Sequence, residues 1–323
     1  MEIHFDPARV DESLTSFYRE LVFLTPATTP RTLVSALTEH LPHLPGEGWT
    51  ALLLRGGAYV NGVCVKQDQQ LPCPCRIQFY EPKGVDDSAI RELGRRIKDF
   101  IVYEDDELLV VYKPQGISSM PTREQQDLNL KCFLESYLQS SSPGAVLHMP
   151  SRVDTSVEGL VVTSKALRMH APLQRVFERR AISKTYLLET KARVEWDKLT
   201  ADRGIAKDPR HPILRQAVPS GGKPARTEFR VLARISDEEG LAERTILKAQ
   251  PITGRTHQIR VHASSYGIPI TGDNFYNGAR ADRLHLVSYQ AEFVHPHQHV
   301  PLKIVPPKSL LPDWLTRSSA LFS

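Results

Sequence analysis

The sequence predicts an α+β protein built around a large mixed, mostly antiparallel sheet, and two observations indicate its fold class and its domain organisation. Through the second part of the chain, short segments rich in Val, Ile and Leu alternate with few helical segments, which is typical of sheet-rich mixed domains. With 323 residues, the chain also exceeds a typical single domain. We therefore expect one large domain with a small additional module.

The N-terminal part has the pattern of a small α/β module. Leu33, Leu37 and Leu41 recur at helical spacing. Asn61 and Gly62 lie between two short apolar runs, which predicts a β-hairpin with a tight turn.

A linker is predicted after this module, because Gly84, Asp86, Asp87 and Ser88 interrupt the periodicity between Pro82 and Asp99. The expected organisation is an N-terminal extension and module over residues 1–82, a linker over 83–99 and a main domain over 100–323.

The main domain alternates predicted strands with a few predicted helices. The segment from Lys165 to Arg180 carries an apolar stripe at helical spacing, and Gly267 suits the end of a second helix. The remaining predicted elements are a helix from Leu128 to Leu138, strands at Gly159–Thr163, Lys184–Leu188 and Thr245–Ala249, and a polar loop from Asp208 to Pro224 that is long enough to be a mobile flap.

Three segments contain polar and charged residues that could form a functional site. The first, residues 254–262, reads Gly-Arg-Thr-His-Gln-Ile-Arg-Val-His and follows a strand and a turn. Arg255 therefore lies where a helix is expected to begin, and the free N–H groups of a helix N-terminus suit a phosphate or a carboxylate. Taken alone, this spacing is also compatible with basic residues that are simply solvated at the start of a helix.

The second segment, residues 151–163, places Asp154 between Arg152 and a glycine that opens an apolar run. Asp154 is then expected at the rim of a loop and not in a core. In the third segment, Tyr186 lies on a half-buried strand beside Arg180 and Lys184. For an isolated tyrosine, an ordinary structural role is the better expectation.

Together these segments resemble the RluA-type family of RNA pseudouridine synthases, which isomerise uridine to pseudouridine within RNA. The resemblance runs from about Val102 to about Pro301. It includes residues 102–116, which look like the family's first motif, Gly222-Lys223-Pro224-Ala225-Arg226-Thr227, which looks like its GKxAxT segment, and residues 293–296, which look like its closing strand.

The resemblance implies the family's fold, with the active site in a central cleft across the sheet, and it implies roles for individual residues. Asp154 takes the position of the catalytic aspartate, Tyr186 that of the active-site tyrosine, and Arg255 that of the arginine that pairs with the aspartate. Arg152 takes the position of an arginine that fills the gap left by the flipped base. It also implies an isomerisation that needs no cofactor.

The same residue types suit this chemistry on physical grounds. A guanidinium within a few ångströms keeps a shielded carboxylate ionised at neutral pH. Such a carboxylate can attack C1′ or C6, or act on a C2′ proton, and the sequence leaves these routes open. A phenol can stack on uracil and relay a proton, and the planar guanidinium of Arg152 suits a wedge in an RNA stem.

This chain departs from the family pattern around the aspartate. Where the family has His-Arg-Leu-Asp followed by Thr-Ser-Gly, this chain has Ser151, Val153, Val157 and Glu158. A carboxylate at Glu158 facing the pocket would raise the pKa of Asp154 and repel phosphate. We therefore expect Glu158 to point away or to pair with a nearby arginine.

The charge distribution favours an RNA partner. Residues 165–227 hold 15 Lys plus Arg against 6 Asp plus Glu, although the whole chain has a net charge of only +4. A basic band of this kind suits contacts with phosphates, and we predict RNA contacts for Arg152, Lys184, Lys223, His257 and Arg260. A solvated helix face is the alternative explanation for the arginines near residues 168–179.

The N-terminal module resembles the S4-type RNA-binding module that some family members carry, although its basic helix is nearly absent. This favours ribosomal RNA slightly over transfer RNA as the target.

Other classes of protein are less consistent with the sequence. Four cysteines are too few and too clustered for a disulfide framework, and neither they nor the histidines have the spacing of a metal site, so no metal is expected. The absence of a long apolar run or a leader favours a cytoplasmic protein without a membrane anchor, and the lack of a large apolar surface stripe favours a monomer.

Two alternatives stay open. A catalytically inactive RNA-binding protein of the same fold would explain the altered residues after Asp154. A hydrolytic glycosidase or nucleosidase needs two carboxylates beside the scissile bond, and Glu158 would be the second only if it faced the pocket.

Overall fold

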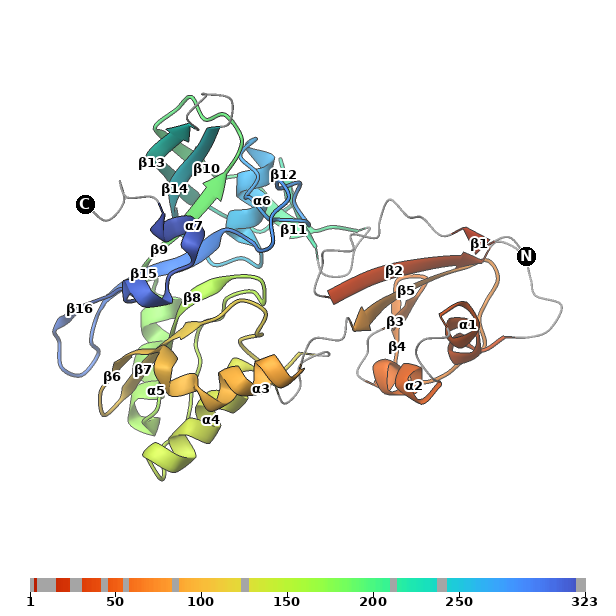
Figure 1. Cartoon of the computed structure of the whole chain (residues 1–323), viewed down its shortest axis with the longest axis horizontal. Coiled ribbons are helices and arrows are strands. Elements are labelled where there is room, and N and C mark those ends of the chain that lie inside the picture. The colour runs from red at the N-terminus through yellow and green to blue at the C-terminus, as the bar shows by residue number, and fades with distance from the viewer. Residues whose placement is uncertain are drawn as a thin grey trace. The chain divides into compact units, whose positions relative to one another are not determined.

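The computed structural model describes residues 3–4, 16–23, 31–41, 46–54, 58–82, 87–122, 128–209, 214–236 and 243–317. By its internal contacts the chain divides into two compact units (Figure 1). The first comprises Met1–Asp87 with Thr122–Gln126, and the second comprises Ser88–Pro121 with Asp127–Ser323.

In its described residues the first unit is an α/β module with an antiparallel five-stranded sheet in the order β1-β2-β5-β3-β4. The helices share one core with strand β5, in which Trp49 packs edge-on against Phe79 with the ring centroids 5.4 Å apart. The elements are β1 (Ile3–His4), β2 (Ser16–Phe23), α1 (Leu33–His40), α2 (Gly46–Leu54), β3 (Ala58–Val60), β4 (Val63–Val65) and β5 (Cys75–Pro82).

Both features predicted for this module are confirmed. Leu33 and Leu37 are buried on α1. Asn61 and Gly62 join β3 to β4 with φ of 52° and 79°, the left-handed conformations that a tight hairpin turn requires. The likeness to an S4-type module stays a prediction.

The second unit contains the large mixed sheet that the sequence predicted. Among the described residues this sheet has nine strands, of which eight follow the order β10-β13-β14-β9-β15-β8-β7-β6 and the ninth, β16, pairs with β15 off this path. Only the pairing of β8 with β15 is parallel among these described strands, and the others are antiparallel.

The strands of this sheet are β6 (Ile101–Glu104), β7 (Leu108–Lys113), β8 (Glu158–Ser164), β9 (Ser183–Thr190), β10 (Lys198–Ala201), β13 (Thr227–Ser236), β14 (Glu243–Pro251), β15 (Leu286–Val294) and β16 (Pro301–Ile304). A separate hairpin consists of β11 (Gly204–Lys207) and β12 (Arg215–Val218) and occupies part of the predicted polar loop.

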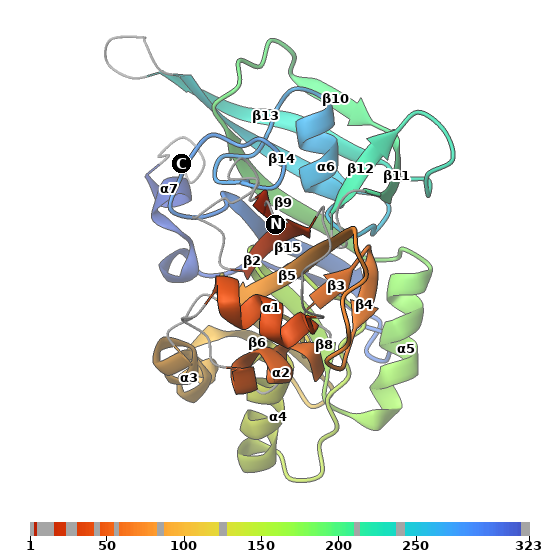
Figure 2. The same cartoon turned by 90° about the vertical axis from the view of Figure 1, so that its right-hand side faces the viewer.

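Helices cover both faces of the sheet (Figure 2). One face packs against α4 and α6, and the other against α7. The helical elements of this unit are α3 (Asp87–Arg95), η2 (Ile97–Phe100), α4 (Leu130–Ser141), α5 (Leu167–Glu178), α6 (Gln258–Ser265), η3 (Lys308–Leu310) and α7 (Asp313–Thr316).

The predicted helices near residues 128–138, 165–180 and before Gly267 are confirmed as α4, α5 and α6. Gly267 follows the end of α6 with φ of 77°, as a helix-terminating glycine does.

The predicted linker over residues 83–99 needs correction, because α3 and η2 occupy most of it. The residues that interrupt the periodicity lie at the start of this segment. Two of them, Asp87 and Ser88, are residue types that suit the beginning of a helix, and α3 begins there. From there Ile90 and Ile97 are buried in the core that includes α4. Residues 83–86 lie outside the described residues, and the domain boundaries themselves stay predictions.

Gly159 explains how β8 and β15 approach each other behind Asp154. Its φ is 116°, and a Cβ at this position would lie 2.3 Å from the carbonyl oxygen of Ser288 on β15. Only glycine allows this approach without displacing the backbone.

Within the described ranges, no helix is both long and apolar enough to cross a membrane.

Candidate active site

Asp154 lies in a loop that leads into β8, and neighbouring residues hold this loop in place. Val153 donates its N–H to the Ser119 hydroxyl over 3.1 Å, and this hydroxyl donates to the Val153 carbonyl over 2.8 Å. The Val157 N–H donates to the Asp154 carbonyl over 3.0 Å. The Asp154 side chain is 29% exposed, so its carboxylate is accessible but largely shielded.

Arg260, in the first turn of α6, pairs with Asp154. Its Nη1 lies 3.4 Å from Oδ2 of Asp154. The same guanidinium donates two hydrogen bonds to the buried carboxylate of Asp273, over 2.8 and 2.7 Å. This bidentate contact fixes the plane of the guanidinium and therefore aims its remaining N–H groups.

The sequence assigned this pairing to Arg255, and the structure corrects that assignment. Arg255 donates from Nε to the Pro224 carbonyl over 3.0 Å, and its backbone N–H donates to Gln258 Oε1. The physical reason is the start of α6, which begins at Gln258 and not at Arg255. Arg255 therefore belongs to the preceding turn, while Arg260 lies on the helix that faces Asp154.

His257 lies beside Asp154 at the N-terminus of α6. Its backbone φ is 56°, a left-handed conformation, and its side chain is only 9% exposed. The Nε2 atom lies 3.8 Å from Oδ2 of Asp154, and the Nδ1 atom lies 2.8 Å from the Tyr276 hydroxyl. His257 was predicted as a contact for RNA, and this low exposure places it inside the site instead of on its surface.

Lys113, at the end of β7, is fully buried near the same loop. Its ammonium donates to the carbonyls of Pro114, Ile117 and Thr155 over 2.8, 2.7 and 3.3 Å. Since Thr155 follows Asp154 directly, Lys113 connects the loop after β7 with the loop that carries Asp154.

The charges around Asp154 favour its ionised form. Burial raises the pKa of this carboxyl, but the charges of His257, Arg260 and Lys113 and the Arg260 hydrogen bond hold its pKa below the ordinary value. Burial lowers the pKa of His257 to about 4. Because His257 is then neutral at pH 7, the Arg260 guanidinium is the main positive charge beside Asp154 at this pH.

The other residues predicted for the site occupy different surroundings. Tyr186 is buried in the hydrophobic cluster that also contains Val157 and Val153, on either side of Asp154. Arg152 is exposed and forms no ion pair within the described part of the chain. Lys223 is exposed in the segment before β13.

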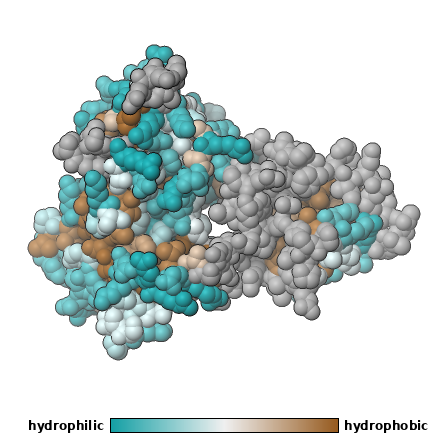
Figure 3. Space-filling model, viewed as in Figure 1, coloured by the Kyte–Doolittle hydropathy of each residue, from teal (hydrophilic) through white to brown (hydrophobic). Residues whose placement is uncertain are grey.

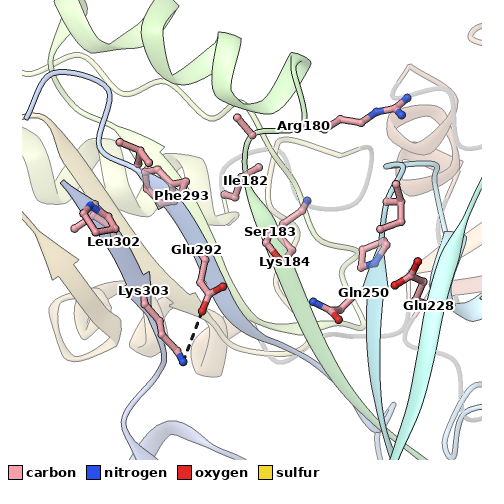
Figure 4. Close-up of a pocket in the computed structure, with 15 residues that line it drawn as sticks. Arg180, Ile182, Ser183, Lys184, Glu228, Gln250, Glu292, Phe293, Leu302 and Lys303 are labelled. Carbon is pink, nitrogen blue, oxygen red and sulfur yellow. Dashed lines mark ion pairs between the residues drawn. The ribbon is translucent and has the colours of Figure 1, made fainter. Parts of the chain in front are cut away.

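Lys184 lies apart from Asp154, in a surface pocket of about 810 Å³ (Figure 4). The pocket forms where β9, β14, β15 and β16 begin or end, and it contains the ion pair between Lys303 and Glu292. Val294 of this pocket is exposed, and hydrophobic residues gather on the surface over the β15–β16 end (Figure 3). Neither Asp154 nor Arg260 lines the pocket, so it is not the candidate active site.

Glu158 points away from Asp154 and pairs with an arginine, as expected. It accepts a hydrogen bond from the Tyr112 hydroxyl over 3.1 Å, and Arg283 Nη1 lies 3.9 Å from its carboxylate. Side chains alternate along β8, so Glu158 lies on the face of Tyr112 while Val157 packs with Tyr186. A two-carboxylate glycosidase site with Asp154 and Glu158 is therefore not formed.

Three site residues were missed from the sequence as functional candidates: Lys113, Asp273 and Tyr276. A lysine at the end of the apolar run Leu108–Tyr112 was one usable signal, since a charge there must be buried with partners. Asp273 follows Gly272 in the loop beyond α6, but nothing in its spacing indicates a contact with Arg260. Among the described residues, no group of His, Cys, Asp or Glu is arranged to hold a metal ion.

The burial of Lys113 predicts a pH dependence of stability. Burial lowers its pKa to about 7 from 10.5, whereas Glu158 and Asp154 act in the opposite direction. Between these two pH values the unfolded chain binds a proton that the folded protein lacks, so this group raises stability as pH rises, by about 1 kcal/mol per pH unit. Denaturant unfolding between pH 7 and 9.5 should show this slope in the wild type and its loss in Lys113→Met. A difference between the two proteins that does not change with pH would contradict the prediction.

Comparisons with known proteins show which family the chain resembles. The model of a family described as RNA pseudouridylate synthase matches residues 107–265. The dual-specificity RNA pseudouridine synthase RluA of Vibrio parahaemolyticus is 36% identical over 219 residues, which cover 66% of this chain and 84% of that protein. The ribosomal large subunit pseudouridine synthase C of Vibrio cholerae is 29% identical over 288 residues, with 84% and 87% covered.

Solved structures show the same likeness. Human RNA pseudouridylate synthase domain containing 1 is similar with a TM-score of 0.53 and 25% identity, over 66% of this chain and 84% of that one. Human RNA pseudouridylate synthase domain containing 4 is similar in fold, with a TM-score of 0.55 and 21% identity, over 73% of this chain and 98% of that one.

Proposed function

This chain belongs to the RluA-type family of RNA pseudouridine synthases, and from that premise we propose that it isomerises specific uridines of ribosomal or transfer RNA with Asp154 as the nucleophile. The observation that carries the proposal is the chain of side chains from Asp154 through Arg260 to Asp273. It keeps one carboxylate ionised and oriented at a place that is shielded but accessible.

The reaction requires that the C1′–N1 bond breaks, that uracil rotates, and that a C1′–C5 bond forms. N1 gains a proton and C5 loses one, so the reaction is balanced without a cofactor. Asp154 supplies the carboxylate, and we assign Tyr186 the role of stacking on uracil and relaying the proton. The burial of Tyr186 in the cluster that flanks Asp154 supports this assignment.

A uridine within a stem must leave its stack before it can react, and unstacking costs a few kcal/mol. The exposed guanidinium of Arg152, two residues from Asp154, suits the role of filling the gap. Exposed cations on the same unit, such as Lys223, suit contacts with phosphates.

The choice of RNA is supported by the relatives. Their names describe a dual-specificity enzyme and enzymes of the ribosomal large subunit. The α/β module of the first unit favours ribosomal RNA slightly over transfer RNA.

Tritium release from transcripts labelled at uracil C5 tests the proposal. The purified protein is given unmodified ribosomal RNA and transfer RNA transcripts in separate reactions, and the digested product is analysed for pseudouridine and for free uracil. We expect release from one pool with pseudouridine as the product. Free uracil would indicate a hydrolase, and RNA binding without release from either pool would indicate the catalytically inactive RNA-binding protein.

A further inference from the structure

His257 occupies an unusual position between a tyrosine and the proposed nucleophile. A left-handed φ is uncommon for a non-glycine residue, and such strain persists where the surrounding contacts maintain it. Here the imidazole and the ring of Tyr276 form a T-shaped contact with the centroids 5.7 Å apart. The backbone thus directs one ring nitrogen to Tyr276 and the other to Asp154.

The hydrogen bonds of Tyr276 decide which nitrogen of His257 carries the proton. The Tyr276 hydroxyl accepts from the backbone N–H of Arg215, in β12, over 3.1 Å. In the described part of the chain, the one acceptor for the hydroxyl proton is Nδ1 of His257, 2.8 Å away. Since Nδ1 accepts, the proton of a neutral imidazole is on Nε2.

The carboxylate of Asp154 favours the same tautomer of His257. Nε2 faces the carboxylate of Asp154 at 3.8 Å. An N–H at this position attracts the carboxylate, whereas a lone pair would repel it. The distance exceeds that of a hydrogen bond, but catalytic hydrogen bonds are often long before substrate binds.

The charge state of His257 agrees with this arrangement. Burial lowers its pKa to about 4, and Asp154 acts in the opposite direction. The ionisable groups that act on it are Asp154, Arg260, Asp273 and Arg215, and Tyr276 stays a neutral phenol because burial raises its pKa.

We propose that His257 is a positioning residue for Asp154, held as the Nε2–H tautomer by Tyr276, within one directed chain that runs from the Arg215 backbone to the reacting carboxylate. The part concerning catalysis rests on the proposed function. The chain connects the β11–β12 hairpin with the site, because Tyr276 shares a hydrophobic cluster with Ile205 of β11 and Val261 of α6. The position of the hairpin therefore affects the orientation of Asp154.

The tautomer is tested without any RNA. Two-bond proton–nitrogen NMR correlations of ¹⁵N-histidine-labelled protein at pH 7 distinguish Nε2–H from Nδ1–H, and the His257→Ala spectrum identifies the His257 signals. We expect Nε2–H in the wild type and a mixture of tautomers in Tyr276→Phe, which keeps the ring but lacks the hydroxyl. Nδ1–H in the wild type, or an unchanged pattern in Tyr276→Phe, would overturn the proposal.

Kinetics test the positioning role. With the transcript that responds in tritium release, His257→Ala should lower kcat by about tenfold to 100-fold with little change in KM. The acid limb of its kcat profile should move to higher pH, because the N–H that favours the Asp154 carboxylate is lost. His257→Gln keeps an amide donor and should recover most of kcat.

His299→Ala is the matched control, since His299 is an exposed histidine with φ of 57°, and the substitution has the same backbone effect away from the site. Equal kcat and pH profiles for His257→Ala and this control would overturn the positioning role. If His257→Ala does not fold, Tyr276→Phe replaces it: the acid limb of its kcat profile should also move to higher pH, and a wild-type profile would overturn the positioning role. If the wild type isomerises no RNA, the proposed function fails, and NMR alone then decides whether the chain to Asp154 exists.

Discussion

Asp154→Asn is expected to abolish turnover, by at least about 10⁴-fold, while the protein stays folded and binds RNA with unchanged affinity. Asparagine matches the size of the side chain but has neither its charge nor its nucleophilicity. Arg260 keeps its bidentate contact with Asp273, so the fold retains the main partner of this buried guanidinium. Single-turnover formation of pseudouridine and a filter-binding assay on the same RNA measure the two effects.

Asp197→Asn is a suitable control for this experiment. Asp197 is 83% exposed and pairs with Arg234 over 2.9 Å, so its loss removes one negative charge away from the site. We expect turnover within about twofold of the wild type, because exposed ion pairs contribute little to stability. Turnover of Asp154→Asn within tenfold of the wild type would exclude Asp154 as the nucleophile.

Arg260→Lys is expected to lower turnover by about 10²-fold to 10³-fold, whereas Arg255→Lys should stay within about threefold of the wild type. A lysine cannot donate in parallel to Asp273 and still reach Asp154, because it lacks the planar fork of a guanidinium. Arg255 donates from its side chain to the Pro224 carbonyl, which a lysine ammonium can also contact. Turnover measured well below the unfolding temperature of each variant distinguishes the two arginines.

The free energy of unfolding should also fall more in Arg260→Lys than in Arg255→Lys. Disruption of a buried ion pair costs about 3–5 kcal/mol, so Arg260→Lys should unfold at a clearly lower denaturant concentration. Asp273→Asn checks that the effect on turnover arises from orientation, since it leaves Arg260 in place but weakens the contact that holds it. A larger loss of turnover in Arg255→Lys than in Arg260→Lys would restore the assignment made from the sequence.

Much of the fold was predictable because its signals are local. The hairpin at Asn61 and Gly62 depends on residues that adopt positive φ, helix α5 follows apolar residues at helical spacing, and α6 ends just before Gly267. The helix α3 was missed, because the breakers at its start were given more weight than the apolar spacing that follows.

The sequence by itself determined the family, the mixed sheet and the choice of Asp154 as the candidate nucleophile, because motifs and periodicity are properties of neighbouring residues. Only the tertiary structure decided which arginine pairs with Asp154. Arg255 and Arg260 belong to one short motif, and the left-handed turn at His257 decides which of them lies on the helix facing the carboxylate. The partners Asp273, Tyr276 and Lys113 likewise meet the site through packing of the sheet and helices, over separations along the chain that no local pattern encodes.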